Sequence, residues 1–313
     1  MKEFDVLVVG ELNADLILRG DVAPAFGQVE KLIDDATLTL GSSSAILACG
    51  AARLGLRVAF IGVVGDDELG RLALRELAAR DVDTSGVVID STIKTGLSVI
   101  LVRDSDRGDD RGDDRAILTF SGSIGALRFV QVNPAMLARA RHLHLGSYFM
   151  LDALRPDVPA LFDAARERGL TLSLDTNYDP SEKWDGGLAQ ALARVDVFLP
   201  NETELCAIAR VADVNVALAH LAARVPTVAV KLGARGGLAR RGDEIAQADS
   251  LQVQVVDTTG AGDSFDAGFV YGYLAGWELA RALRLGCVCG SLATCAAGGT
   301  AAQPTLSQAL EAM

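Results

Sequence analysis

The densest group of residues that could do chemistry lies between positions 257 and 269, which read DTTGAGDSFDAGF. The preceding residues Leu251–Val256 are strand-like, and residues Gly262–Ala275 carry the apolar pattern of a helix. The small residues between them therefore form a turn that becomes the first turn of a helix. Free N–H groups gather at such a helix start, where the helix dipole is positive. This stretch predicts a binding site for an anion.

Four residues of this turn carry the predicted reaction. Glycine lets an anion approach the backbone closely, so a phosphoryl group would meet the N–H groups of Gly260, Ala261 and Gly262. Asp263 follows in the first helical turn, where its carboxylate could take the proton of a hydroxyl during phosphoryl transfer. An aspartate at this position is also a common capping residue. The turn by itself leaves both roles for Asp263 open.

The elements that must position this turn alternate along the chain between apolar strands and amphipathic helices. The predicted strands are Phe4–Gly10, Val58–Val64, His142–Leu145, Thr171–Asp175, Val195–Leu199 and Thr227–Leu232. The predicted helices are Ser42–Leu54, Asp67–Arg80, Val158–Arg168, Leu188–Ala193, Glu202–Ala209 and Gly262–Ala275. This alternation predicts an α/β fold with a doubly wound, mostly parallel sheet flanked by helices.

Two segments interrupt the alternation. Residues from about 15 to 40 and from about 95 to 120 carry strand patterns without helices between them, which predicts a small antiparallel sheet outside the main core. Between the second pair of strands lies Asp104–Arg115, a run of mixed charges and glycines that is typical of a solvated hairpin tip. Its carboxylates suggest calcium as an alternative, but their spacing does not match an EF-hand loop.

Composition limits the kind of ligand and the setting. The 313 residues carry a net charge of −12 without a concentrated basic patch, which argues against a nucleic-acid partner. No leader-like pattern opens the chain, and the uncharged stretch Leu285–Leu310 contains Pro304, so we expect a cytoplasmic protein without a membrane span. The cysteines form no CxxC pair and are interpreted as reduced core residues: Cys49, Cys206, Cys287, Cys289 and Cys295.

The turn at 257–263 resembles the second signature of the PfkB, or ribokinase-like, carbohydrate kinases, D-T-x-G-A-G-D. Further similarities follow in the family's order at Asn13–Asp15, at Gly41–Gly70 and at Asn201–Glu204. The resemblance covers essentially the whole chain. It implies one ribokinase-like domain over residues 1–313, with the two segments without helices as a lid over the substrate. It also implies ATP-dependent phosphorylation of a sugar hydroxyl, with Mg²⁺ as the cofactor.

The resemblance assigns the reacting groups and the sugar site. Asp263 becomes the catalytic base, and the amides of Gly260–Gly262 become the anion hole for the transferred phosphoryl group. Asn13 and Asp15 are expected to hold sugar hydroxyls, since an amide and a carboxylate can donate and accept at once. Without the family, these two residues are an ordinary turn after the first strand. The start of the next helix adds three further sugar-binding candidates, Gly41, Ser42 and Ser43.

The nucleotide and cation sites follow from the same resemblance. Asn201 and Glu204 are expected to position Mg²⁺ and the phosphates through water, although they also suit a plain helix start. Gly233 is expected to line the nucleotide site, and Lys231 either reaches a phosphate or points to solvent. Three residues match positions that bind a monovalent cation in some members, which makes K⁺ activation an expectation: Asp257, Thr259 and Thr305.

Departures from the family leave the substrate open. The chain has Gly41–Ile46, GSSSAI, where ribokinases have G-G-K-G-A-N, so ribose is not predicted. The D-x-N-x-R motif of some sugar-acid kinases lacks its arginine at Asp175–Asp179, and no obvious basic pair in the lid would hold a phosphorylated sugar.

Two alternatives to a sugar kinase remain. A nucleoside kinase of the same fold would need aromatic residues at the lid, where only Phe120 and Phe129 stand. A non-catalytic sugar sensor would not need a base beside an anion hole. A dinucleotide-binding dehydrogenase is excluded, because no G-x-G-x-x-G follows the first strand.

A homodimer formed through the lid is expected.

Overall fold

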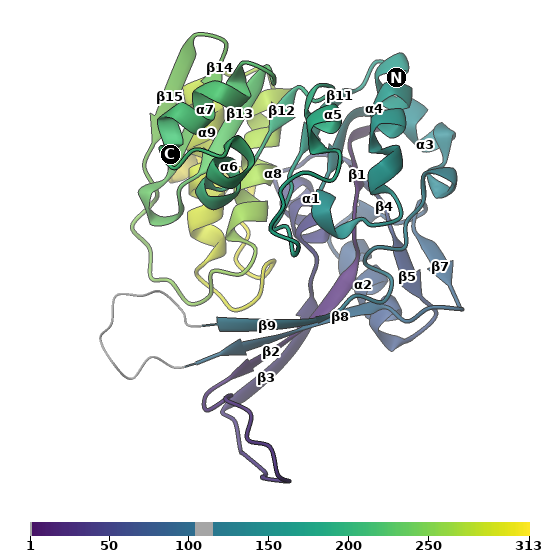
Figure 1. Ribbon diagram of the computed structural model, residues 1–313. Coiled ribbons are helices and arrows are strands. Elements are labelled where there is room, and N and C mark those ends of the chain that lie inside the picture. Colours follow the sequence, from purple (N-terminus) through teal and green to yellow (C-terminus); the bar gives the residue numbers. More distant parts are fainter. Residues whose placement is uncertain (1, 104–114) are drawn as a thin grey trace.

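The computed structural model describes residues 2–103 and 115–313. The predicted hairpin tip Asp104–Arg115 lies outside the described residues, except for Arg115 itself. Within the described ranges, strands and helices alternate as expected, and a small separate sheet projects from the main body (Figure 1).

Nine strands of the described chain form the main sheet, in the order β15-β14-β13-β12-β11-β10-β1-β4-β6. Every pairing from β13 to β6 is parallel, and β14 and β15 add an antiparallel edge, so the prediction of a mostly parallel sheet is confirmed. The strands of this sheet are β1 (Phe4–Val9), β4 (Val58–Ile61), β6 (Val82–Asp83), β10 (Ala140–Leu145), β11 (Thr171–Leu174), β12 (Val197–Phe198), β13 (Thr227–Lys231), β14 (Gly237–Arg241) and β15 (Glu244–Ala248).

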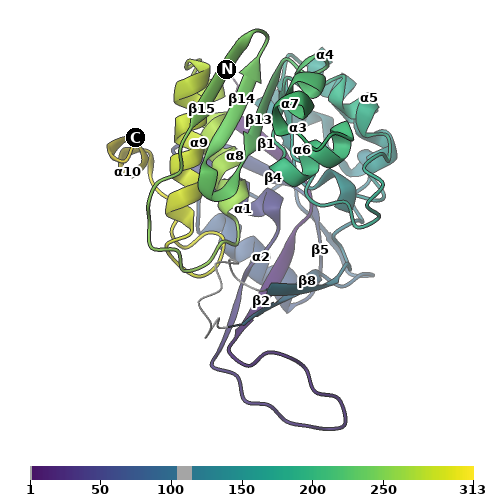
Figure 2. The same ribbon diagram turned by 60° about the vertical axis from the view of Figure 1, so that its left-hand side comes forward.

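Helices cover both faces of this sheet (Figures 1 and 2). The α-helices are α1 (Ser43–Arg53), α2 (Glu68–Ala78), α3 (Pro134–Arg139), α4 (Val158–Glu167), α5 (Leu188–Leu192), α6 (Glu202–Ala209), α7 (Val214–Ala222), α8 (Ala261–Leu274), α9 (Leu279–Ala293) and α10 (Leu306–Glu311). Short 3₁₀ turns occur at Phe129–Gln131, Tyr148–Met150, Arg155–Asp157 and Gly233–Arg235.

The central strand β1 shows why this sheet needs two helical layers. All of its six residues are buried, because successive side chains point to opposite faces and both faces are covered. Leu7 and Val9 join an apolar cluster with α4 and α7, whereas Val6 and Val8 join the cluster that contains residues of α1, α8 and α9. The continuous apolar run of β1 therefore contributes alternate side chains to two separate hydrophobic cores, one on each face of the sheet.

The lid sheet has the strand order β3-β2-β8-β9 and consists of β2 (Asn13–Arg19), β3 (Asp35–Leu40), β8 (Gly96–Val102) and β9 (Arg115–Phe120). Both segments without helices thus form it, as expected. The prediction that it is antiparallel is wrong for its central pair, because β2 and β8 run parallel. The two outer pairs, β3 with β2 and β8 with β9, are antiparallel. The connection from β2 to β3 extends away from the body (Figure 2).

Three smaller predictions need correction. Residues Leu251–Val256 form no regular strand, and their backbone is instead attached to α9 through the Leu251 N–H and the Val256 N–H. The predicted strand Val58–Val64 is divided at Gly62 into β4 and a short β5 (Val63–Gly65), which pairs with β7 (Val88–Asp90). Cys295 is exposed and Cys206 is only half-buried, so the assignment of all five cysteines to the core is wrong for these two.

No single helix among the described residues is both long and apolar enough to cross a membrane. The helices α6 and α7 reach that length and hydropathy only when taken together, and they meet at an angle of 66°.

Candidate active site

A cavity of about 720 Å³ lies where the carboxyl ends of the parallel strands meet the lid. Asp175, Asn201 and Lys231 reach it from the ends of β11, β12 and β13, and this edge is where α/β sheets commonly bind ligands. Asp15 and Ser98 line it from the lid strands β2 and β8. The start of α8 completes the wall, so the predicted anion turn and the predicted sugar site share one cavity.

The start of α8 has the geometry of a helix end that only glycine fits. Gly260 precedes the first helical residue with φ of 73°, and a Cβ there would lie 2.7 Å from the Gly299 Cα. Gly260 and Gly262 both line the cavity. The Ala261 N–H instead donates to the Thr258 carbonyl at 3.3 Å. Of the three residues predicted to supply amides, Gly260 and Gly262 thus lie at the cavity wall.

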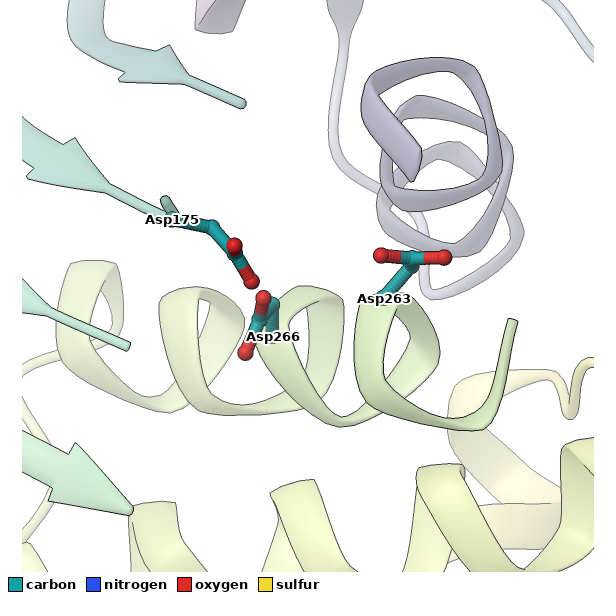
Figure 3. Close-up of side chains that lie close together, drawn as sticks. All are labelled: Asp175, Asp263 and Asp266. Carbon is teal, nitrogen blue, oxygen red and sulfur yellow. The ribbon is translucent and has the colours of Figure 1, made fainter. Parts of the chain in front are cut away.

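Asp263 lies in the first turn of α8 (Figure 3), and it lines the same cavity. Burial raises the pKa of its carboxyl to about 7, and the nearby Asp175 carboxylate adds to this effect. The Lys231 ammonium and the Ser43 hydroxyl oppose it. A carboxyl with a pKa near 7 can both take up and release a proton around neutral pH, as a general base requires.

Lys231 is held by two buried carboxylates. Its ammonium donates to Asp175 Oδ2 at 2.5 Å and to Asp266 Oδ2 at 2.9 Å. Burial lowers the pKa of Lys231, but the charges of Asp175, Asp266 and Glu204 outweigh burial and hold it well above its usual range. Lys231 therefore lines the cavity as a charged, partnered side chain, and the sequence-based alternative of a solvent-facing lysine is wrong.

Carboxylate oxygens of Asp175, Asp263 and Asp266 come within 4.8 Å of one another (Figure 3). Burial raises the pKa of Asp266 well above its ordinary value, whereas Lys231 outweighs burial and lowers that of Asp175. The Lys231 ammonium contacts both Asp175 and Asp266 and so supplies positive charge inside this group. We assign no metal to it.

The lid side of the cavity carries the predicted sugar residues. The Asn13 amide donates to Asp15 Oδ1 at 3.1 Å. Burial raises the pKa of Asp15 to about 7, and the charge of Glu11 adds to this effect. Gly41 stands directly against this pair, since a Cβ there would lie 2.2 Å from Asp15 Oδ1 and 2.7 Å from Asn13 Nδ2. The glycine thus leaves room for the two polar side chains.

The two predicted serines differ in what they offer. Ser42 caps α1: its hydroxyl donates to the Glu11 carbonyl at 2.6 Å and accepts from the Ala45 N–H at 3.0 Å. Ser43 is half-buried, and its hydroxyl accepts from the Asn177 amide at 3.2 Å. Both serines line the cavity, but the hydroxyl of Ser42 is already engaged in holding the helix start. Ser43 is the better candidate for contact with a ligand.

Asn201 and Glu204 form a capping box at the start of α6. The Glu204 N–H donates to Asn201 Oδ1 at 2.9 Å, and the Asn201 amide donates to Glu204 Oε1 at 2.7 Å. Burial and the charge of Asp175 raise the pKa of Glu204 to about 7. Both residues line the cavity, together with Gly233, whose φ of 61° favours glycine. The predicted nucleotide residues therefore all line the same cavity.

The three residues expected to bind a monovalent cation are already engaged with other groups. Asp257 is buried and accepts from Arg19 Nη2 at 3.0 Å and from the Thr259 N–H at 2.9 Å. The Thr259 hydroxyl oxygen accepts a hydrogen bond from Arg115 Nη1 at 3.4 Å. Thr305 caps α10 through its contacts with Gln308.

Sequence reasoning missed several cavity residues. The buried Glu11 accepts from the Ser44 hydroxyl at 2.5 Å, and Arg115 lines the cavity from β9. Asp175 was considered only as part of an incomplete motif, although its place at a strand end was a usable signal. Asp266 gave no signal beyond being a charged residue in an apolar helix, which is itself unusual.

The chain is similar to known proteins over nearly its whole length. The model of the pfkB family of carbohydrate kinases matches residues 3–306. A Halopiger xanaduensis protein named ATP-dependent ribose-1-phosphate kinase is 33% identical over 302 residues, covering 96% of this chain and 95% of that protein. A fructokinase of Klebsiella pneumoniae is 33% identical over 281 residues, covering 84% of this chain and 88% of that protein.

A solved structure shares the fold. It is an Escherichia coli protein described as a candidate ribokinase II, in complex with ATP and Mg²⁺. It aligns with a TM-score of 0.82 and 25% sequence identity, and the alignment covers 98% of each chain.

Proposed function

This chain belongs to the pfkB family of carbohydrate kinases, and we propose that it transfers the γ-phosphoryl group of ATP to a hydroxyl of a small sugar, with Asp263 as the general base. The observation that carries this proposal is the placement of Asp263. Its carboxyl, with a pKa of about 7, stands in the first turn of α8, in the same cavity as Gly260, Gly262 and the polar lid residues.

The reaction needs a proton acceptor and a place for negative charge. As the sugar oxygen bonds to the γ-phosphorus, the hydroxyl proton passes to Asp263 and the bond to ADP breaks. The N–H groups of Gly260 and Gly262 at the positive end of α8 stabilise the charge on the transferred group. Both effects require the sugar hydroxyl to lie between Asp263 and the nucleotide.

The sugar is held from the lid side. Asp15 accepts from sugar hydroxyls and Asn13 both donates and accepts, since the two form a hydrogen-bonded pair at the cavity. Ser43 and the Asn177 amide that donates to it add further donors and acceptors at the cavity. A ring of hydroxyl-binding groups of this kind suits an uncharged polyol.

The nucleotide is held on the wall formed by Asn201, Glu204 and Gly233. Glu204 presents a hard carboxylate oxygen at the cavity, which fits Mg²⁺ held through water. Mg²⁺ bound with ATP supplies positive charge beside the phosphate oxygens. Asn201 fixes the Glu204 carboxylate through two hydrogen bonds, and Lys231 keeps a positive charge next to this wall.

The test is ATP consumption with Mg²⁺ over a panel of sugars, sugar acids, polyols and nucleosides, with wild type and Asp263→Asn in parallel. Turnover of a sugar by wild type, lost in the variant, supports the proposal. Turnover of nucleosides alone would identify a nucleoside kinase. If no compound is phosphorylated while both proteins bind sugars equally, the chain is a sugar sensor and the proposal fails.

One observation favours a second acceptor class, a phosphorylated sugar. Arg115 lines the cavity from β9, and its contact among the described residues is the neutral Thr259 hydroxyl. Among residues 2–103 and 115–313, this guanidinium has no carboxylate partner, so it is available to an anionic group on the acceptor. The Halopiger xanaduensis relative is named for ribose-1-phosphate. If this candidate holds, Arg115→Gln raises the KM for a sugar phosphate at least tenfold more than that for the unphosphorylated sugar; equal changes would reject it.

A homodimer through the lid is supported by the outer face of the lid sheet. The strand registers align Leu38, Leu16, Val99 and Leu118 in one row across all four strands. Leu38, Leu118 and Phe120 are at least half exposed, so an apolar surface faces away from the cavity. Light scattering should give twice the chain mass of 32.7 kDa for wild type and a single mass for Leu118→Glu. A monomeric wild type would reject the dimer.

A further inference from the structure

The turn that leads into α8 is fixed by one buried carboxylate. Asp257 Oδ1 accepts from the Thr259 N–H at 2.9 Å, and Asp257 Oδ2 accepts from the Gly298 N–H at 2.9 Å. Arg19 Nη2 also donates to Asp257 Oδ2, at 3.0 Å. Asp257 therefore holds together the start of the turn, the segment at Gly298 and a charged side chain from elsewhere in the fold.

That charged side chain comes from the lid. Arg19 is the last residue of β2, the strand that also carries Asn13 and Asp15. The side chain of Arg19 is 20% exposed and that of Asp257 is 4% exposed, so water screens this ion pair much less than it screens a surface pair. A guanidinium stays charged at every pH that a folded protein meets. Asp257 thus has a permanent positive partner.

The observed contacts do not fit a resident monovalent cation at this carboxylate. Asp257 Oδ2 already accepts from the Arg19 guanidinium and the Gly298 N–H, and Asp257 Oδ1 accepts from the Thr259 N–H. The Thr305 hydroxyl is engaged with Gln308 at 3.0 Å in the cap of α10. A second positive charge within a few ångströms of Arg19 would also be repelled by it.

We infer that the Arg19 guanidinium takes the place of a monovalent cation in this chain, so that the turn 257–260 is positioned and turnover proceeds without K⁺. The inference rests on the proposed kinase function. Arg19 acts as a positioning residue: it balances the charge of Asp257, Asp257 fixes the turn, and the turn presents the N–H groups of Gly260 and Gly262 to the phosphoryl group.

The same contact joins the lid to the anion turn. Arg19 from β2 reaches Asp257, and Arg115 from β9 reaches Thr259, two residues further along. A lid displaced from the cavity would leave Asp257 without its guanidinium. The strand that carries Asn13 and Asp15 is therefore also the strand that supplies the guanidinium to the turn.

The first test compares cations. Wild type, Arg19→Ala and Arg19→Lys are assayed in equal concentrations of KCl and of tetramethylammonium chloride, whose cation is too large for a site between protein oxygens. We expect the wild-type rate to be equal in both salts. Arg19→Ala should lose about 10- to 100-fold in tetramethylammonium chloride, since a small misplacement of groups around the reacting centre has effects of this size. KCl or guanidinium chloride should restore part of this lost rate. The rate of Arg19→Lys should fall less than that of Arg19→Ala and should be the same with and without K⁺.

The second test does not depend on turnover. Thermal unfolding midpoints are measured for wild type and Arg19→Ala in the same two salts. We expect K⁺ to raise the midpoint of Arg19→Ala by about 2 °C or more, because a cation that binds only the folded state stabilises it, and to leave wild type unchanged. A purely structural loss of Arg19 would lower the midpoint equally in both salts.

Several results would overturn the inference. Stimulation of wild type by K⁺ over tetramethylammonium would show that a cation is still needed, while leaving the kinase proposal intact. If K⁺ changes neither the rate nor the unfolding midpoint of Arg19→Ala, then no cation can bind at Asp257 in place of the guanidinium. If wild type phosphorylates no sugar, the proposed function fails, and the unfolding midpoints alone decide whether Arg19 occupies a cation position.

Discussion

Replacing Asp263 by asparagine should have opposite effects on activity and on stability. Asparagine keeps the size and the hydrogen-bonding capacity of the side chain but cannot take up the hydroxyl proton. General-base assistance is worth about 10²–10⁴-fold in rate, so kcat should fall by that factor. In wild type, kcat/KM should fall about tenfold for each pH unit below 7, because only the ionised carboxyl acts as a base and its pKa is about 7.

The effect on stability follows from the same pKa. The Asp263 carboxyl has an ordinary value of 3.8 and a value of about 7 in the folded chain. Between these pH values the folded state binds the proton more strongly than the unfolded state does, so the free energy of unfolding decreases as pH rises through this window. The full difference corresponds to roughly 4 kcal/mol, and to less where water reaches the carboxyl. Asp263→Asn removes this penalty.

The assay is therefore a pair of pH series. Thermal midpoints of Asp263→Asn and wild type should agree near pH 4 and diverge up to pH 7, with the variant the more stable by several degrees. The exposed Asp243, in the turn between β14 and β15, provides a matched control, and Asp243→Asn should change neither activity nor the pH series. A variant that keeps more than a tenth of the wild-type rate, or a stability difference that is constant with pH, would refute the reasoning.

Three further substitutions test other parts of the cavity. Asp15→Ala should raise the sugar KM about 10- to 100-fold, the usual worth of a charged hydrogen bond, with the ATP KM unchanged; an equal rise in both would contradict a sugar-binding role. Gly41→Ala should also raise the sugar KM, because its Cβ would come within 2.2 Å of Asp15 Oδ1, and unchanged kinetics would count against this placement. Lys231→Met should reduce the free energy of unfolding by about 3–5 kcal/mol in urea titrations, since Asp175 and Asp266 lose their buried cation. A loss below about 1 kcal/mol would show that the network reorganises.

Local patterns explain what could be predicted from the sequence. The alternation of apolar strands and amphipathic helices predicted the mostly parallel sheet, because burial on both faces requires continuous apolar runs. The turn at 257–263 predicted the start of α8, since glycines followed by a helical pattern specify a helix end within a few residues. The candidate residues Asn13, Asp15 and Asn201 followed from short motifs, and all three line the cavity.

The sequence did not reveal how charges from distant segments pair. For Lys231, the sequence allowed either a contact with phosphate or a side chain in solvent. Its partners could not be foreseen, because Asp175 and Asp266 lie 56 and 35 residues away along the chain. The parallel pairing of β2 with β8 was missed for the same reason, since strand patterns do not specify which strand becomes the neighbour or in which direction it runs.

The sequence by itself therefore determined the fold class, the turn at 257–263 and the position of Asp263, because each depends on residues that are close along the chain. The tertiary structure alone decided the direction in which burial shifts the pKa of the buried acids, and it alone decided the partner of Asp257. Arg19 and Asp257 are 238 residues apart, and they meet because the last residue of β2 reaches the turn that precedes α8. Pairing of buried charges depends on which segment ends converge at the sheet edge, and convergence is a property of the packed chain.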